Sequence, residues 1–212
     1  MKSFVYIVSI ESIEGKEMNR KVLSLKKLIN GLLKNGAKEM TGRSRGIKIR
    51  EHIEKMLREE KESLLLSLDF SGVGPIDFSW ADEVVAKMIS RLWSGEYGEK
   101  FIFLKGLNAS QAENISVALE RKRLAALVTG SEGWQIIGSL NNYLAHTLNQ
   151  VMAKRHLTLR QLSEEEGIGM NTSGTRLLNL YKKRLVVRVE GPATKKDDTH
   201  RGRQFVYQSL LG

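Results

Sequence analysis

Hydrophobic positions in the first 130 residues follow two different spacings. Residues 4–10 alternate and are rich in β-branched and aromatic side chains, which predicts a strand. Residues 63–70 (SLLLSLDF) and 101–104 are nearly continuous apolar runs, typical of strands covered on both faces. Residues 124–128 predict a last short strand.

Leucine, isoleucine and valine at helical spacing predict helices between and around these strands. The predicted helices span residues 18–33, 47–57, 79–93 and 110–121. Alternating strands and helices are typical of a layered α/β fold. The sequence therefore predicts an N-terminal α/β domain whose largely parallel or mixed sheet is packed with helices.

A short polar stretch rich in glycine, residues 129–133, predicts the boundary between two domains, 1–130 and 131–212. Beyond it the pattern predicts one long helix over 134–153 and a short helix over 157–165 with Thr158 as N-cap.

A turn at residues 167–169 is predicted to lead into a third helix, capped by Asn171 or Thr172 and ending near Lys183. Two β-rich segments, 185–190 and 203–208, face each other across a loop. This order of elements predicts a C-terminal α+β domain.

The charge pattern adds to this picture. The chain carries a net charge of +10, which favours polyanionic partners. Residues 1–130 hold 22 Lys and Arg against 17 Asp and Glu, and residues 131–212 hold 12 against 7. The excess is +5 in both parts, so the shorter C-terminal part is the more basic per residue.

Residues 157–190, which begin LTLRQLSEEEGIG, resemble the winged helix-turn-helix family. The resemblance covers about 75 residues. Leu159, Leu162, Ile168 and Ser173 match its core positions, as do three further leucines, Leu177, Leu180 and Leu185. It implies binding of double-stranded DNA by the helix that follows the turn.

If Leu177 and Leu180 face inward, the opposite side of that helix presents polar side chains to a major groove. Lysines at its end suit phosphate contacts, and the basic loop 191–202 suits the backbone or the minor groove. The predicted DNA-binding residues are Arg160, Asn171, Thr172, Thr175, Arg176, Asn179, Lys182, Lys183, Lys195, Lys196, Arg201 and Arg203.

A plainer interpretation of this region is also open. Basic residues at helix ends are often solvated side chains that favour the helix dipole, and winged helices also serve as protein-docking modules. Asp197 and Asp198 reduce the charge of the loop. Gly174 lies inside the third helix, which indicates either a close backbone approach or a later helix start.

Residues 68–82, LDFSGVGPIDFSWAD, resemble the STAS fold of sulfate transporters and anti-sigma-factor antagonists, especially its bacterial STAS-like branch. The resemblance extends over about residues 40–128. It implies a sensor or partner-binding domain. The family's phosphorylated serine lies in a DSSG motif; Asp77 and Ser79 match that motif, whereas Phe78 and Trp80 depart from it.

Independently of the family, Ser79 precedes a helix and Asp82 follows three residues later, so the sequence predicts Ser79 as an N-cap. A phosphate on Ser79 would lie at a helix N-terminus and be favoured by its dipole. Asp77 and Ser79 are thus the predicted switch residues. The glycine-rich segment 41–46 is a candidate phosphate site without P-loop or dinucleotide spacing.

Several classes of function receive no support. The chain has no cysteine, and its four histidines lack metal-ligand spacing, so we expect no metal or other cofactor. No nucleophile–base arrangement is evident, so we expect a protein other than an enzyme. The first residues do not form a signal peptide and no apolar run is long enough to cross a bilayer, so we expect a cytoplasmic protein without a membrane partner.

The leading hypothesis is a DNA-binding transcriptional regulator, with the helix at 134–153 forming a homodimer and the N-terminal domain binding a small ligand or protein partner. Two alternatives stay open. One is a phospho- or partner-switched interaction module that does not bind DNA. The other is a nucleotide-sensing α/β domain fused to a winged helix.

Overall fold

A computed structural model describes residues 5–13, 16–33, 41–191 and 205–211. The chain divides into two compact units. Unit 1 comprises Met1–Glu11 and Met18–Leu140, and unit 2 comprises Ser12–Glu17 and Asn141–Gly212. Each unit has its own helices, strands and buried side chains, and each is described by itself.

Unit 1 is built on a sheet with the strand order β1-β2-β3-β4-β5-β6. Strands β2 to β5 are parallel in chain order, and β6 is antiparallel to β5. A mixed sheet therefore organises the α/β part of the chain. The strands are β1 (Val5–Ile13), β2 (Lys16–Ser24), β3 (Leu64–Asp69), β4 (Lys100–Lys105), β5 (Ala125–Gly130) and β6 (Gly133–Gly138).

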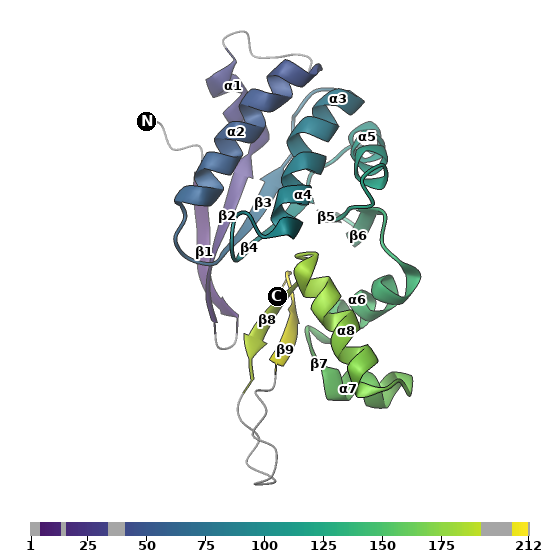
Figure 1. The fold of residues 1–212 in the computed structure, drawn as a ribbon. Helices are drawn as coiled ribbons and strands as arrows, with labels where there is room; N and C mark the ends of the chain where they lie inside the picture. The colour runs from purple at the N-terminus through teal and green to yellow at the C-terminus, as the bar shows by residue number, and fades with distance from the viewer. Residues whose placement is uncertain (1–4, 14–15, 34–40, 192–204, 212) are drawn as a thin grey trace. The chain divides into compact units, whose positions relative to one another are not determined.

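The helices of unit 1 connect the parallel strands and pack on the sheet (Figure 1). Alternate residues of β3, such as Leu64 and Leu66, are fully buried in one apolar cluster with helix residues such as Leu57 and Val84. The helices are α1 (Leu25–Leu32), α2 (Arg43–Glu59), α3 (Phe78–Ala81), the π-helical turn η1 (Asp82–Ala86), α4 (Lys87–Ser94) and α5 (Ala109–Glu120).

The predicted helix over 18–33 is wrong in its first half. Residues up to Ser24 form β2, which pairs with β3 from Asn19 opposite Leu64 to Ser24 opposite Asp69. The helix begins only at Leu25, where the Ser24 hydroxyl accepts a hydrogen bond from the Lys27 amide. Helical spacing of leucines was present, but pairing with residues 45 positions further along the chain outweighed it.

The predicted helix over 134–153 is also wrong at its start. Residues 133–138 form β6, in register with β5 from Gly130 opposite Gly133 to Ala125 opposite Gly138. Gly133 has a φ of 110°, a conformation that glycine can adopt because it has no Cβ. The glycine-rich stretch at 129–133 is thus a turn within unit 1, and the two units divide after Leu140 rather than at Gly130.

In its described residues, unit 2 combines three helices with a three-stranded antiparallel sheet in the order β7-β9-β8 (Figure 1). Its core contains Leu144, Leu148, Leu162, Leu177 and Leu180. Strand β7 was not predicted. The elements are α6 (Asn142–Lys154), β7 (His156–Thr158), α7 (Leu159–Glu166), α8 (Met170–Lys182), β8 (Val186–Glu190) and β9 (Phe205–Ser209).

The caps of these helices confirm one prediction and correct another. Thr158 is the N-cap of α7, in a capping box with Gln161. The predicted cap of α8 at Asn171 or Thr172 is wrong, because α8 begins at Met170 with Gly169 as N-cap. The left-handed Gly167 ends α7 and turns the chain, so Gly169 can already accept the first hydrogen bond, from the Ser173 amide.

Candidate nucleic-acid interface

Helix α8 has one buried face and one accessible face. Leu177 and Leu180 are fully buried, as predicted, and Ser173 is buried beside them. Gly174 is inside the helix, and a Cβ built on it would meet no atom within 4 Å, so neither a later helix start nor a close contact within the chain explains this glycine. The exposed side chains of the helix, such as those of Asn171, Thr172 and Thr175, lie away from this buried face.

That face brings together five of the predicted residues. Asn171, Thr172 and Thr175 are exposed, whereas Arg176 and Asn179 are half-buried. Together with Tyr143 from α6 they line an open hollow of about 440 Å³. The Thr175 hydroxyl donates to the Asn171 carbonyl at 2.8 Å, which leaves its oxygen as an acceptor toward the outside.

Sequence reasoning missed Tyr143. This residue is 46% exposed at the start of α6, and the Arg176 guanidinium lies 5.5 Å from its ring centroid. An exposed tyrosine in an amphipathic helix carries no special signal in a sequence. Only the packing of α6 against α8 assigns it to this surface.

Arg176 is held in place rather than extended into solvent. Its Nη1 atom donates to Oε2 of Glu166 at 2.6 Å, and Glu166 is the last residue of α7. His146 of α6 places Nε2 3.3 Å from the other carboxylate oxygen of Glu166. The side chains of Arg176 and Glu166 are only 20% and 12% exposed, so the ion pair is partly shielded from water.

The other predicted cations are distributed around this face. Arg160 is exposed in the first turn of α7, and Lys182 is exposed in the last turn of α8. Lys183 is half-buried, and burial lowers the pKa of its ammonium group. Lys195, Lys196, Arg201 and Arg203 lie outside the described residues.

A second group of cations, not identified from the sequence, lies beyond the end of α8. Arg188 of β8 lies over the rings of Tyr181 and Phe205, 4.6 Å and 4.3 Å from their centroids. Arg184, just before β8, lies 5.3 Å from the Tyr181 centroid. Contact with aromatic rings restrains both guanidinium groups beside β8.

In unit 1, the two predicted switch residues, Asp77 and Ser79, have different roles at the start of α3. The predicted N-cap at Ser79 is wrong, because Asp77 caps the helix by accepting from the Trp80 amide at 2.8 Å. The other oxygen of Asp77 accepts from the Gly42 amide at 2.9 Å. An ionised carboxylate is a stronger acceptor for these amides than a hydroxyl. Ser79 lies inside the first turn and is half-buried.

The glycine-rich segment 41–46 is the candidate phosphate site predicted from the sequence, a site expected in a loop. Its residues from Arg43 onward instead form the first turn of α2, with Gly42 as N-cap. Arg43 points at the acidic pair on η1, 3.7 Å from Asp82 and 3.6 Å from Glu83. The Arg43 side chain in this segment is therefore directed toward internal carboxylates.

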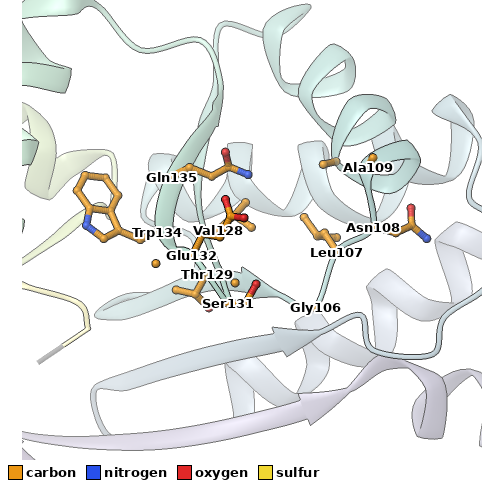
Figure 2. Close-up of a pocket in the computed structure, with 13 residues that line it drawn as sticks. Gly106, Leu107, Asn108, Ala109, Val128, Thr129, Ser131, Glu132, Trp134 and Gln135 are labelled. Atoms are coloured by element: carbon orange, nitrogen blue, oxygen red, sulfur yellow. The ribbon is translucent and has the colours of Figure 1, made fainter.

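Unit 1 also contains a cavity of about 840 Å³ at the carboxyl ends of β4 and β5 (Figure 2). One wall is the β5–β6 hairpin with Thr129, Ser131 and Glu132, and the other is the segment from Gly106 to Ala109. Among the described residues that line it, only Glu132 is charged. Parallel α/β sheets bind ligands at this edge.

Comparisons with known proteins do not assign the chain to a family. No protein-family model and no curated protein matches it. Among the described residues, no helix has the length and apolar character to cross a bilayer, and no three His, Asp or Glu side chains converge as a metal site. The functional argument therefore depends on the geometry of the two units.

Proposed function

We propose that unit 2 is a winged helix-turn-helix that binds duplex DNA, and that the protein is a transcriptional regulator with unit 1 as its sensor. The observation that supports this is the accessible polar face of α8, opposite the buried Leu177 and Leu180. In this proposal α7 and α8 form the helix-turn-helix, and β8 and β9 form the wing.

The dimensions of α8 suit this role. Its 13 residues extend about 20 Å, and a major groove about 12 Å wide admits one α-helix. Asn171, Thr172 and Thr175 occupy its N-terminal half, from which bases are read. Asparagine pairs with adenine, and threonine can donate, accept or contact the thymine methyl group.

The cations around α8 suit contacts with phosphates. Arg160 and Lys182 are exposed at the beginning of α7 and the end of α8. Such contacts increase affinity without reading sequence. Lys183 contributes less, because it is half-buried and therefore less accessible to a phosphate.

The test uses the purified full chain and labelled duplexes from a randomised pool, with anisotropy measured over a range of salt concentrations. We expect retention that weakens steeply with salt. In R160A/K182A the slope of log K against log salt should fall by about 1.8, because each lost phosphate contact removes about 0.9. K55A, which removes an exposed lysine of unit 1, should leave the slope unchanged. No salt-sensitive binding to any duplex would refute the proposal.

We further propose that unit 1 is a STAS-like domain whose cavity beside Glu132 binds a small neutral or cationic ligand. Its volume, about 840 Å³, is within the range of small-molecule sites. A ligand is favoured over phosphorylation of Ser79, because Ser79 is half-buried and the adjacent Trp80 amide already binds Asp77.

A thermal-shift screen tests the ligand proposal. Neutral polar compounds should raise the melting temperature more than cyclic nucleotides do, because the described lining of the cavity includes a glutamate and no basic side chain. Preferential stabilisation by a cyclic nucleotide would favour the nucleotide-sensing alternative instead.

A homodimer on paired half-sites remains part of the proposal, but the predicted basis for it has changed. The helix that was expected to join two copies begins at Asn142, after β6, and ends at Lys154. Sedimentation of the full chain with and without a palindromic duplex measures the oligomeric state directly.

A further inference from the structure

We propose that Glu166 is a positioning residue that sets the sequence discrimination of unit 2 by holding Arg176. This inference rests on the proposed DNA-binding function and goes beyond it. It assigns a role to an acidic side chain in a surface otherwise expected to be basic. The evidence is the ion pair between α7 and α8 and the aromatic ring beside it.

The guanidinium of Arg176 is contacted from two other helices. Glu166 of α7 accepts from its Nη1 atom at 2.6 Å, and the ring of Tyr143 of α6 lies 5.5 Å away. Arg176 itself stands on the second turn of α8. Three helices therefore restrain one side chain at the edge of the hollow that Asn171 and Asn179 also line.

Holding Arg176 in this way leaves part of its binding capacity free. A guanidinium has five N–H groups in a planar fork, and the hydrogen bond to Glu166 occupies one. The remaining donors are presented in a fixed plane, which reduces the ordering cost of pairing with a base edge. The acceptor edge of guanine suits such a fork.

Glu166 also affects the contacts of Arg176 with DNA phosphates, which compete with its pairing to a base. An arginine without a partner on this face would pair readily with any phosphate, which is a sequence-independent contact. The negative charge of Glu166 competes for the guanidinium and repels the phosphate backbone. Both effects lower the affinity for random DNA more than the affinity for a matched site. Glu166 therefore raises the ratio of matched-site affinity to random-DNA affinity.

The experiment compares two substitutions that each remove one negative charge from the end of α7. Glu164 is exposed, whereas Glu166 binds Arg176, and glutamine preserves the size of either side chain. Affinities are measured for a duplex selected by the wild-type protein from a randomised pool and for a random duplex, together with R176A and the double variant E166Q/R176A.

In E166Q we expect tighter binding to the random duplex, weaker or equal binding to the selected duplex, and a ratio reduced about tenfold, the size of one lost bidentate base contact. In E164Q both affinities should rise together and the ratio should stay constant. The double variant should lose no more discrimination than R176A alone, because the two residues act as one unit.

The possible results separate the inference from the proposed function. If the wild-type protein binds no duplex, both fail. If it binds and E166Q keeps the wild-type ratio, the inference alone is refuted. The same holds if E166Q lowers only the melting temperature, or if the losses in E166Q and R176A add, because Glu166 would then act through the fold and not through Arg176.

Discussion

Each unit contains a glutamate paired with an arginine of a neighbouring helix, and the two pairs differ in depth. In unit 1, Glu83 of η1 pairs with Arg50 of α2, and their side chains are 1% and 9% exposed. In unit 2, Glu166 and Arg176 are 12% and 20% exposed. A deep pair connects helices internally, whereas a pair at the surface leaves donors that another molecule can use.

The surroundings of the two pairs reinforce this difference. Glu83 also accepts from Lys87 at 2.5 Å, and Arg50 lies 3.3 Å from Glu54, so the deep pair is part of a network of charged groups. The Cβ of Glu83 lies so close to α2 that only a glycine, Gly46, fits opposite it. The pair in unit 2 instead borders an open hollow.

The largest expected effect is at the deep pair. E83Q should destabilise unit 1 by about 3 kcal/mol, because it leaves Arg50 buried with Glu54 as its remaining partner. All three tryptophans lie in unit 1, so urea unfolding followed by tryptophan fluorescence reports this unit. A loss below 1 kcal/mol would show that the pair is not what joins α2 to η1.

Acid should weaken unit 1 through the same glutamate. Burial disfavours the charged form of Glu83, but Lys87 and Arg50 outweigh it and lower the pKa of this carboxyl below its ordinary value of 4.5. A lowered pKa in the folded state contributes stability that is present above about pH 4.5 and is lost as the pH falls through the folded value. Fluorescence-monitored unfolding at a series of pH values should show this loss in the wild type and a shallower dependence in E83Q.

A smaller effect is expected at the helix cap of unit 1. D77A should cost about 1 kcal/mol, because the amides of Trp80 and Gly42 both lose their acceptor. D77N is the matched control and should retain most of the stability, since asparagine caps helices nearly as well. Equal losses in the two variants would mean that the negative charge, and not the cap, supplies the stabilisation.

Two glycines inside helices allow the units to be compared with the same substitution. G174A should stabilise unit 2 by about 1 kcal/mol, because a methyl group there meets no atom and alanine favours the helix. G46A should destabilise unit 1, because its Cβ would lie 2.9 Å from the Cβ of Glu83. Thermal unfolding by far-UV circular dichroism measures both, and opposite signs are expected.

The smallest effect on stability is expected at the partly exposed pair. E166Q should change the stability of unit 2 by less than about 1 kcal/mol, because water and the remaining amide oxygen compensate for the charge. The tryptophan transition of unit 1 should be unaltered. A loss as large as that expected for E83Q would place the Glu166–Arg176 pair among the structural contacts and remove the distinction between the two regions.

Local patterns in the sequence predicted much of the fold. The strand at 63–70, the helix at 110–121 and the cap at Thr158 were predicted because their signals lie within a few residues of one another. The predictions failed at 18–24 and 134–138, where segments became strands by pairing with β3 and β5. Short apolar segments fit either a helix or a strand, and the partner decides.

The candidate site was also predictable only in part. The spacing of Leu177 and Leu180 indicated which face of α8 is accessible, and burial confirms that orientation. The restraint on Arg176 could not be predicted, because Glu166 and Tyr143 are brought to it from two other helices. In sequence, an arginine on a polar face has the same appearance whether it is restrained or free.

By itself, the amino-acid sequence determined the elements that depend on neighbouring residues: the α7 cap, the buried face of α8 and the apolar runs of the central strands. Only the tertiary structure decided which charges are internal and which border an accessible surface. The physical reason is that the strength of an ion pair and the availability of its donors depend on how much water surrounds it, and that depends on packing between distant segments.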